Sequence, residues 1–289
     1  MAHKSDTSKA PLTSSTSVHD ALESAITAIA GAGCDTPRLD AELLLANVLS
    51  VGRERLLTDP ELTVAGPAVR AFQDVVRRRA VEREPVAYIT GSRHFRRLEL
   101  AVDRRALIPR PETELLVEVA LGLPAGARVL DLGTGCGAVA LALKDERPDL
   151  HVSASDISGP ALELASLNAE LLRLDVQFLH ADLLPELEFD AVLSNPPYVA
   201  DSERAQLAPE IVRYEPPIAL FAGADGLAVI RPLLDQLAQR PHVRFLALEV
   251  GAGQAVPVSQ LVRMSGFDAV RFERDLARIQ RVVIAERHG

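Results

Sequence analysis

Apolar residues in the first third of the chain recur at helical spacing. Between residues 38 and 51 they form one stripe along a predicted helix: Leu39, Leu43, Leu44 and Val48. The same spacing predicts helices from Val18 to about residue 31 and from about residue 67 to residue 80. Residues 1–18, rich in Ser, Thr, Lys and Pro, predict a flexible tail. We therefore expect residues 19–86 to form a small helical domain.

The pattern changes between residues 87 and 108. Leu98, Leu100 and Val102 alternate with polar residues, which predicts a strand within a β-hairpin. We expect this segment, residues 87–108, to link two domains. Pro109 and Pro111 then interrupt regular structure, and a helix is predicted from about residue 113 to residue 121.

Residues 109–289 alternate between short apolar runs and amphipathic segments. The apolar runs predict seven strands, at residues 128–132, 151–155, 176–179, 191–194, 243–250, 269–272 and 281–285. Helices are predicted among them, at residues 139–144, 161–172, 227–239 and 256–264. Alternation of this kind, closed by a strand pair, is typical of an α/β domain with a doubly wound, mostly parallel sheet.

Composition narrows the class of protein. The 289 residues are 48% hydrophobic and 25% charged, which excludes a disordered, collagen-like or coiled-coil chain. No apolar run is long enough to cross a membrane, and the first residues lack the apolar core of a secretory signal. The two cysteines, Cys34 and Cys136, form no Cys-x-x-Cys pair. We therefore expect a cytoplasmic protein with no disulfide framework and no metal site.

A glycine-rich loop joins a predicted strand to a predicted helix. It consists of Gly133, Thr134, Gly135, Cys136 and Gly137. Glycine lets the backbone turn tightly and approach a ligand, and the amides that open the helix then face that ligand. The spacing Gly-x-Gly-x-Gly departs from the Gly-x-Gly-x-x-Gly of dinucleotide-binding loops, which weakens a pyrophosphate interpretation.

Two acidic residues follow the next two strands. Asp156 ends the second strand, where a carboxylate can accept hydrogen bonds from both ribose hydroxyls of NAD or of S-adenosylmethionine. Alternatively, Asp156 or Ser158 caps the following helix. Asp182 follows the third strand and either binds an adenine amino group or caps a turn.

The most specific signal is the sequence Asn195-Pro196-Pro197-Tyr198, which opens at the carboxyl end of the fourth strand. Two successive prolines fix the backbone and remove two donors, so the Asn195 side-chain oxygen and the Pro196 carbonyl form an acceptor-rich corner. A planar NH₂ group can donate one hydrogen to each acceptor. Tyr198 offers a ring against a flat substrate group or a cationic sulfonium. The pattern favours transfer of a methyl group to a planar nitrogen by positioning and electrostatics.

Together the glycine loop and this corner resemble the class I S-adenosylmethionine-dependent methyltransferases. The chain from about Arg38 to Val283 resembles the PrmC/HemK family of peptide chain release factor N(5)-glutamine methyltransferases. Several separate stretches carry the resemblance: residues 38–45, 84–91 with Phe95, 107–114 (Leu-Ile-Pro-Arg-Pro-Glu-Thr-Glu), 214–216, 249–251 with Gln254, 274–276 and 281–283. The resemblance implies a Rossmann-like catalytic domain over residues 109–289 and a release-factor-recognition role for residues 19–86.

The family also implies a reaction. The protein would transfer a methyl group from S-adenosyl-L-methionine to the glutamine side chain of the Gly-Gly-Gln motif of release factors, leaving S-adenosyl-L-homocysteine. By position, the cofactor would be held by Gly133, Thr134, Gly135, Cys136, Gly137, Asp156, Asp182, Leu183 and Asn195. Catalysis and glutamine binding would fall to Asn195, Pro196, Pro197 and Tyr198. Some relatives have Trp where this chain has Leu183, so an aliphatic side chain would replace an aromatic one beside adenine. We interpret Cys136 as a packing residue.

Charge is unevenly distributed. The net charge of −9 argues against stable binding of nucleic acid, yet residues 52–110 carry 13 arginines and eight acidic residues. One hypothesis is that these arginines contact an acidic release factor or ribosomal RNA: Arg77, Arg78, Arg79, Arg93, Arg96, Arg97, Arg104 and Arg105. The other is an ordinary solvated helix face.

Three alternative functions share the same motifs. The first is a methyltransferase for a glutamine in a ribosomal protein. The second is a DNA N(6)-adenine methyltransferase, which would need phosphate contacts and base flipping; the acidic C-terminal part of the chain argues against it. The third is a scaffold that binds the cofactor without catalysis, against which the intact Asn195–Tyr198 corner argues.

Overall fold

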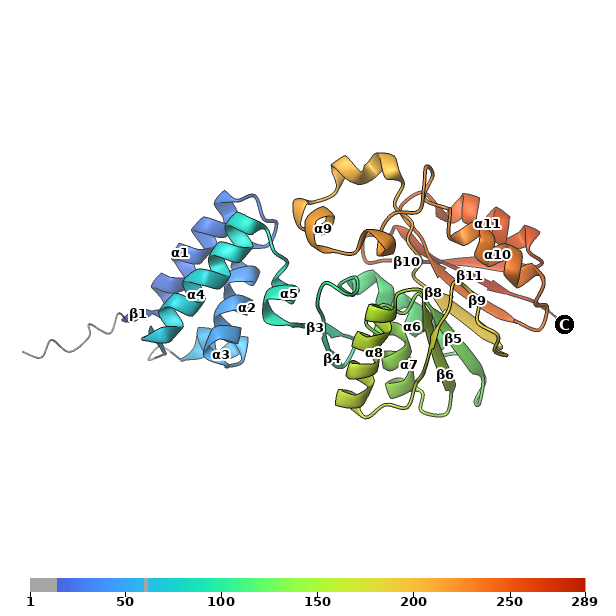
Figure 1. The fold of residues 1–289 in the computed structure, drawn as a ribbon, viewed down its shortest axis with the longest axis horizontal. Coiled ribbons are helices and arrows are strands. Elements are labelled where there is room, and N and C mark those ends of the chain that lie inside the picture. The colour runs from blue at the N-terminus through green and yellow to red at the C-terminus, as the bar shows by residue number, and fades with distance from the viewer. Residues whose placement is uncertain (1–14, 60–61, 289) are drawn as a thin grey trace, which may run out of the picture. The chain divides into compact units, whose positions relative to one another are not determined.

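The computed structural model describes residues 15–59 and 62–288 and divides into two compact units, the first ending at Thr90 and the second beginning at Gly91 (Figure 1). Most of the predicted tail lies outside the described residues; its described end, Ser15–Ser17, is strand β1. Within the described residues, no helix has both the length and the apolar character needed to span a bilayer.

The first unit is mainly helical, as the apolar spacing predicts. Its elements are β1, α1 (Val18–Gly31), α2 (Pro37–Leu49), α3 (Arg53–Thr58), β2 (Thr63–Ala65), α4 (Pro67–Arg77), the π-helical turn η1 (Arg78–Glu82) and α5 (Val86–Thr90). Ser17 caps α1 by accepting from the Asp20 amide at 3.0 Å. Pro37 and Pro67 begin α2 and α4, where proline's missing amide hydrogen costs no helical bond.

The core of this unit is mainly aliphatic, with Ile29, Leu44 and Leu45 buried together with Phe72 among α1, α2 and α4. One buried ion pair crosses it. Arg79 Nε donates to Asp40 Oδ2 at 2.6 Å, and both side chains are less than 10% exposed. Thr36 Oγ1 donates to the other oxygen of Asp40 at 2.8 Å. The pair therefore fixes the end of α4 and η1 against α2.

The second unit contains a seven-stranded sheet in the order β10-β11-β9-β8-β5-β6-β7. Its strands are β5 (Arg128–Leu132), β6 (His151–Asp156), β7 (Gln177–His180), β8 (Ala191–Ser194), β9 (Phe245–Glu249), β10 (Ala269–Arg274) and β11 (Gln280–Glu286). All neighbouring pairs are parallel except β11 with β9 and with β10. The predicted mostly parallel, doubly wound fold is confirmed.

Helices cover both faces of this sheet, with α6, α7 and α8 on one side and α10 and α11 on the other (Figure 1). They are α6 (Glu114–Ala120), α7 (Ala138–Glu146), α8 (Gly159–Leu172), α10 (Ile230–Ala238) and α11 (Ala255–Met264). Aliphatic side chains fill the layer beneath α10 and α11, including Val192, Leu233, Leu246 and Val258. Apolar burial on both faces explains why these strands are near-continuous apolar runs.

Short elements complete the second unit. The hairpin consists of β3 (Ser92–Phe95) and β4 (Leu98–Ala101). The remaining pieces are the 3-10 turns η2 (Pro111–Thr113), η3 (Asp201–Gln206) and η4 (Pro217–Ala219) and the helix α9 (Pro209–Tyr214). The linker was predicted to begin at residue 87, but residues 87–90 belong to helix α5 of the first unit. The hairpin itself clusters with the sheet.

The register of the three central strands sets the position of the site. Leu132 at the end of β5 pairs with Ser155 of β6 on one side and with Ser194 of β8 on the other. Ser194 is fully buried, and its Oγ donates to the Leu132 carbonyl at 2.7 Å. The loops that follow these strands therefore leave the sheet side by side, at the carboxyl edge where α/β proteins bind ligands.

The buried ion pair of the first unit gives a stability prediction. Arg79→Ala should lower the free energy of unfolding of this unit by about 3 kcal/mol, because Asp40 then keeps a buried charge without its partner. Arg77→Ala is the matched control, since Arg77 pairs with Asp74 and Glu82 at the surface. Urea unfolding of the full chain, followed by circular dichroism, should show a much larger shift for Arg79→Ala. Equal shifts would contradict the importance of the buried pair.

Candidate active site

A cavity of about 440 Å³ opens at the carboxyl edge of β5, β6 and β8. It brings together most of the residues that the sequence singled out, namely Gly133, Thr134, Gly135, Cys136, Asp156, Asp182, Leu183, Asn195, Pro196 and Pro197. Gly137 and Tyr198 are not among the lining residues. Thr113, at the end of η2, also lines the cavity, so the Pro-rich stretch contributes to its wall.

The glycine loop has the backbone geometry that only glycine adopts without strain. Gly133, Gly135 and Gly137 have φ values of 71°, 58° and 88°. A Cβ on Gly137 would also lie 2.9 Å from Leu141 Cδ1. The amides of Gly133 and Thr134 donate to the Ser155 carbonyl at 2.8 and 3.0 Å, which ties the loop to β6.

Asp131 supports this loop from behind. Its Oδ2 accepts from Thr134 Oγ1 at 2.6 Å and from the Ala140 amide at 3.1 Å. Gly137, which precedes α7, has no side chain to cap the helix, so the Asp131 carboxylate satisfies one of its free amides instead. Complete burial raises the pKa of Asp131 to about 6.

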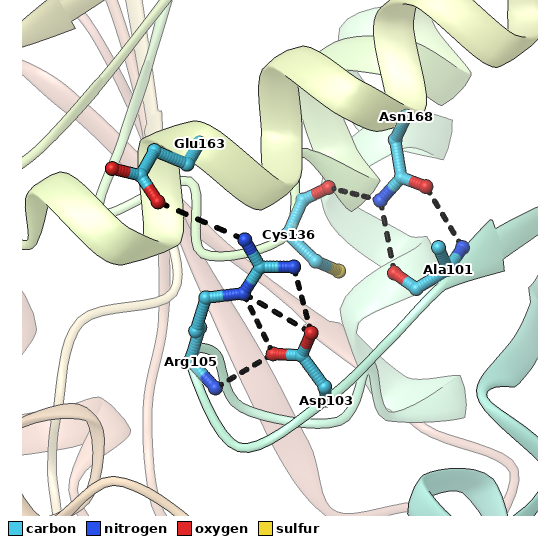
Figure 2. A network of polar contacts seen from close by, with 6 residues as sticks. All are labelled: Ala101, Asp103, Arg105, Cys136, Glu163 and Asn168. Carbon is cyan, nitrogen blue, oxygen red and sulfur yellow. Dashed lines mark hydrogen bonds and ion pairs between the residues drawn. The ribbon is translucent and has the colours of Figure 1, made fainter.

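Asn168 fastens the same loop to the hairpin (Figure 2). Its Nδ2 donates to the Cys136 carbonyl at 2.9 Å and to the Ala101 carbonyl at 3.0 Å, while its Oδ1 accepts from the Ala101 amide at 2.8 Å. Asn168 is buried in α8, and sequence reasoning did not identify it. Cys136 is buried as well, and burial raises the pKa of its thiol to about 12, in keeping with packing rather than nucleophilic chemistry.

Asp156 is held in a fixed orientation at the cavity wall. Its Oδ2 accepts from the Gly135 amide at 2.9 Å, and its Oδ1 accepts from the Ser158 amide at 2.8 Å. Each carboxylate oxygen can accept a second hydrogen bond, so both remain able to bind hydroxyl groups. Ser158, not Asp156, caps α8, because its Oγ accepts from the Ala161 amide.

The wall beyond Asp156 is mixed in character. Asp182 is exposed and Leu183 half-buried, and both line the cavity. Leu183 has a φ of 65°, which is strained for a side chain of this kind, and packs against the core beneath α10 and α11. Ile157 adds a second aliphatic side chain to this wall.

The residues of the Asn195–Tyr198 corner lie in two places: Asn195, Pro196 and Pro197 line the cavity, and the Tyr198 hydroxyl contacts Glu249. Asn195 Nδ2 donates to Thr113 Oγ1 at 3.1 Å, and no hydrogen bond from the described residues reaches Asn195 Oδ1. Pro196 and Pro197 follow it along the cavity wall. Tyr198 instead extends its hydroxyl to Glu249 Oε1, to which it donates at 3.3 Å. The structure therefore places the acceptor group of Asn195 at the cavity and the Tyr198 hydroxyl away from it.

Glu249 is a second residue that the sequence did not mark as functional. It ends β9 and is 1% exposed, and burial raises the pKa of its carboxyl group to about 7. Its Oε1 accepts a hydrogen bond from the Tyr198 hydroxyl at 3.3 Å, and within the described residues its buried Oε2 has no hydrogen-bond partner. Burial likewise raises the pKa of the Tyr198 phenol well above its usual range. In the sequence, Glu249 belongs to one of the stretches that resemble the family, residues 249–251 with Gln254, but no role was assigned to it.

An ion pair joins the Pro-rich stretch to the loop before η4. Arg110 Nη2 donates to Glu215 Oε1 at 2.5 Å, and Glu215 is 3% exposed. Burial raises the pKa of the Glu215 carboxyl group. Pro216 and Ile218, which follow, line the cavity. The pair therefore fixes one cavity wall against another.

The arginine-rich region is largely neutralised within each unit. Arg77, Arg78 and Arg79 pair with acidic residues of the first unit. In the second unit, Arg96 binds both oxygens of Glu146 at 2.7 Å, Arg97 pairs with Asp145, and Arg105 pairs with Asp103. Figure 2 shows Arg105 between Asp103 and Glu163. Each of these six side chains has an acidic partner within its own unit, and contact of this region with a release factor or ribosomal RNA stays a prediction.

Comparison with known families matches both units. The model of the PrmC N-terminal domain matches residues 20–91, and that of the methyltransferase small domain matches residues 111–221. Proteins named release factor glutamine methyltransferase align over most of the chain. The one from Deinococcus radiodurans is 39% identical over 94% of this chain and 99% of its own length. The one from Coxiella burnetii is 39% identical over 87% of this chain and 92% of its own.

The chain belongs to the release factor glutamine methyltransferase family.

Members of this family are methyltransferases, and the resemblance inferred from the sequence is confirmed. The relative from Mycolicibacterium smegmatis reaches 46% identity over 76% of this chain and 79% of its own. Solved structures agree on the fold. The hMettl16 catalytic domain in complex with MAT2A 3'UTR hairpin 6 superposes with a TM-score of 0.56 at 18% identity, covering 77% of this chain and 82% of that one. A methyltransferase from Pyrococcus furiosus gives 0.50 at 17% identity, covering 66% and 90%.

The geometry of the glycine loop gives a second stability prediction. Gly137→Ala should lower the free energy of unfolding by about 2 kcal/mol, because the new Cβ meets Leu141 and the positive φ is unfavourable. Gly159→Ala is the control, since its Cβ would meet nothing within 4 Å and its φ is ordinary. Thermal unfolding should separate the two variants. Similar melting temperatures would contradict the tight fit inferred at Gly137.

Proposed function

We propose that this protein transfers a methyl group from S-adenosyl-L-methionine to the side-chain amide nitrogen of the glutamine in the Gly-Gly-Gln motif of peptide chain release factors. The observation that carries the proposal is about 40% identity, over 86–94% of the chain, to proteins named release factor glutamine methyltransferase. The side chains that line the cavity support the same function.

The cavity suits S-adenosyl-L-methionine. The Asp156 carboxylate is held so that its free acceptor positions suit the two ribose hydroxyls. Asp182 supplies an acceptor for the adenine amino group, and Leu183 and Ile157 supply aliphatic surface in place of an aromatic ring. The open backbone of the glycine loop lets the ligand approach closely. When bound, the cofactor supplies an electrophilic methyl group, and S-adenosyl-L-homocysteine remains.

The Asn195 corner suits a primary amide. Asn195 uses its NH₂ group on Thr113, so the carbonyl oxygen is the end left for a substrate. Pro196 has no amide hydrogen and contributes its carbonyl. Two acceptors beside each other bind the two hydrogens of a glutamine NH₂ group and hold its nitrogen in place. Catalysis then rests on positioning, because the methylated nitrogen can release its extra proton to water.

We also propose that the first unit, expected as the recognition domain over residues 19–86, contacts the release factor, because residues 20–91 match the PrmC N-terminal domain. Because release factors act on ribosomes, we also propose that the reaction takes place in the cytoplasm. Methylation of a ribosomal-protein glutamine, methylation of adenine in DNA, and cofactor binding without catalysis are the competing functions, and no feature of the described residues favours them.

A methylation assay tests the proposal. The protein is incubated with isotopically labelled S-adenosyl-L-methionine and, separately, an unmodified release factor, unmethylated duplex DNA and unmodified ribosomal proteins. Peptide mass spectrometry then locates the methyl group. A methyl group on the Gly-Gly-Gln glutamine, absent when that glutamine is replaced by Asn, is the expected result. Label in DNA or ribosomal protein alone would overturn the proposed substrate, and label nowhere would favour a binding scaffold.

Two substitutions should separate binding from catalysis. Asn195→Ala should lower kcat on the order of 100-fold, because it removes an acceptor that positions the amide. Its affinity for S-adenosyl-L-homocysteine, measured by calorimetry, should stay within about threefold of wild type, since Asp156 is intact. Asp156→Ala should weaken that affinity at least ~10-fold. Unchanged activity in Asn195→Ala would contradict the role assigned to the corner.

A further inference from the structure

The Tyr198 end of the corner is tied to the segment that follows β9. Gln254 Nε2 donates to the Tyr198 carbonyl at 2.9 Å, across 56 positions of the chain, and Gln254 Oε1 accepts from the Gly251 amide at 2.9 Å. The Tyr198 hydroxyl donates to Glu249 Oε1 at 3.3 Å. Both the backbone and the side chain of Tyr198 are therefore held by residues 249–254, to which sequence reasoning assigned no role.

The backbone partners decide which way the Gln254 amide points. The Tyr198 carbonyl can only accept a hydrogen bond, and the Gly251 amide can only donate one. The NH₂ end of the Gln254 side chain must therefore face Tyr198, and its oxygen must face Gly251. A side chain that lacks either function leaves one of these backbone groups without its partner. The two partners thus favour glutamine over a carboxylate or an aliphatic side chain of the same length.

Two glycines leave the room that this contact needs. A Cβ on Gly226 would collide with the Tyr198 carbonyl oxygen and would lie 2.7 Å from Gln254 Nε2. A Cβ on Gly251 would lie 2.9 Å from Gln254 Oε1 and 3.2 Å from Tyr198 Cδ2. The Gln254 amide is therefore flanked closely by backbone on two sides, and packing as well as hydrogen bonding fixes its place against Tyr198.

The corner itself forms a stiff link between Asn195 and Tyr198. The rings of its two prolines fix φ, and a residue that precedes a proline is itself restricted. At one end of the link, Asn195 Nδ2 donates to Thr113 Oγ1 at 3.1 Å. At the other end, Gln254 holds the Tyr198 carbonyl. The Pro196 carbonyl, one of the two proposed acceptors for the substrate amide, lies between these two anchors.

We propose that Gln254 is a positioning residue, which holds the Asn195–Tyr198 corner so that Asn195 Oδ1 and the Pro196 carbonyl receive the substrate NH₂ group together. This inference rests on the proposed function, because it assigns Gln254 a role in binding the target glutamine. Gln254 is not among the residues that line the cavity, so it acts through the corner and not by contact with the substrate. Loss of its contact lets the Tyr198 end of the corner shift, which misplaces the amide nitrogen relative to the methyl donor.

The first test removes the donor alone. Gln254→Glu keeps the size of the side chain and an acceptor for the Gly251 amide, but it sets a carboxylate oxygen against the Tyr198 carbonyl. We expect kcat on a release factor to fall on the order of 10- to 100-fold, with KM for both substrates within about threefold of wild type. The stoichiometry of S-adenosyl-L-homocysteine binding, measured by calorimetry, should stay unchanged, which separates this effect from a loss of folded protein.

Two further variants serve as controls. Gln260→Glu is the matched control, because Gln260 is exposed on α11 and has no side-chain hydrogen bond within the described residues. It should keep the wild-type kcat. Gln254→Met removes both hydrogen bonds without adding a charge, and it should lower kcat as Gln254→Glu does. This variant decides the question if the carboxylate prevents folding. Wild-type kcat in a folded Gln254 variant would overturn the proposal.

The second test combines Gln254→Glu with Asn195→Ala. Because Gln254 acts through the corner, it matters less once the Asn195 acceptor is gone, so the double variant should have a kcat within about threefold of that of Asn195→Ala. Residues that act independently would instead give losses that multiply. A double variant whose loss equals the product of the two single losses would contradict the positioning role.

The outcomes keep the two proposals apart. A wild-type protein that methylates the release factor, with Gln254 variants that behave like it, supports the function and rejects the positioning role. A wild-type protein that methylates no release factor rejects the function itself and, with it, the assignment of Gln254 to glutamine binding.

Discussion

Strand β5 lies between β6 and β8, and its pairing with both decides where each group of the site stands. Because Leu132 pairs with Ser155 and with Ser194, the three strands end at the same level. The glycine loop, Asp156 and Asn195 follow these ends directly. A shift of one residue in either pairing would turn every side chain on that strand to the opposite face and separate the cofactor side of the cavity from the substrate side.

Buried polar contacts then fix the positions of the loops that leave the sheet at this edge. Asp131 and Asn168 hold the glycine loop from opposite sides, one through the start of α7 and the other through the hairpin. The Arg110–Glu215 pair holds the Pro-rich stretch. The Asn168 and Arg110–Glu215 contacts join segments far apart in sequence, and Asp131, Asn168 and Glu215 are each buried. Buried polar contacts of this kind favour one arrangement, since an alternative that breaks them leaves further polar groups unpaired.

The sequence predicted the sheet and the cavity wall well, for a physical reason. Strands that are buried on both faces consist of consecutive apolar residues, which are easy to recognise in a sequence. The predicted strands at residues 128–132 and 191–194 therefore have the same first and last residues as β5 and β8. Because β5 and β8 are parallel neighbours, the motifs that follow them, the glycine loop and the Asn195–Tyr198 sequence, lie at the same edge of the sheet. Short elements such as α3 and the β1–β2 pair carry too few residues for a periodic signal and were not predicted.

Long-range contacts were beyond sequence reasoning. Asn195 meets Thr113 across 82 positions, and Asn168 meets Ala101 across 67. The Tyr198 hydroxyl binds Glu249, a partner 51 positions away that the sequence alone does not place nearby, and a role of the Tyr198 ring beside the substrate stays a prediction. The acidic partners of the arginine-rich region are scattered along the chain, as Arg96 and Glu146 illustrate, so the sequence alone did not reveal these ion pairs.

The central claim is that two acceptors of one corner hold the amide nitrogen that receives the methyl group. The most direct measurement is a crystal structure of the protein with S-adenosyl-L-homocysteine and a peptide containing Gly-Gly-Gln. The account predicts that the glutamine NH₂ group donates to Asn195 Oδ1 and to the Pro196 carbonyl, while Asn195 Nδ2 remains on Thr113. A glutamine bound elsewhere, or an Asn195 amide with its nitrogen toward the peptide, would contradict the account.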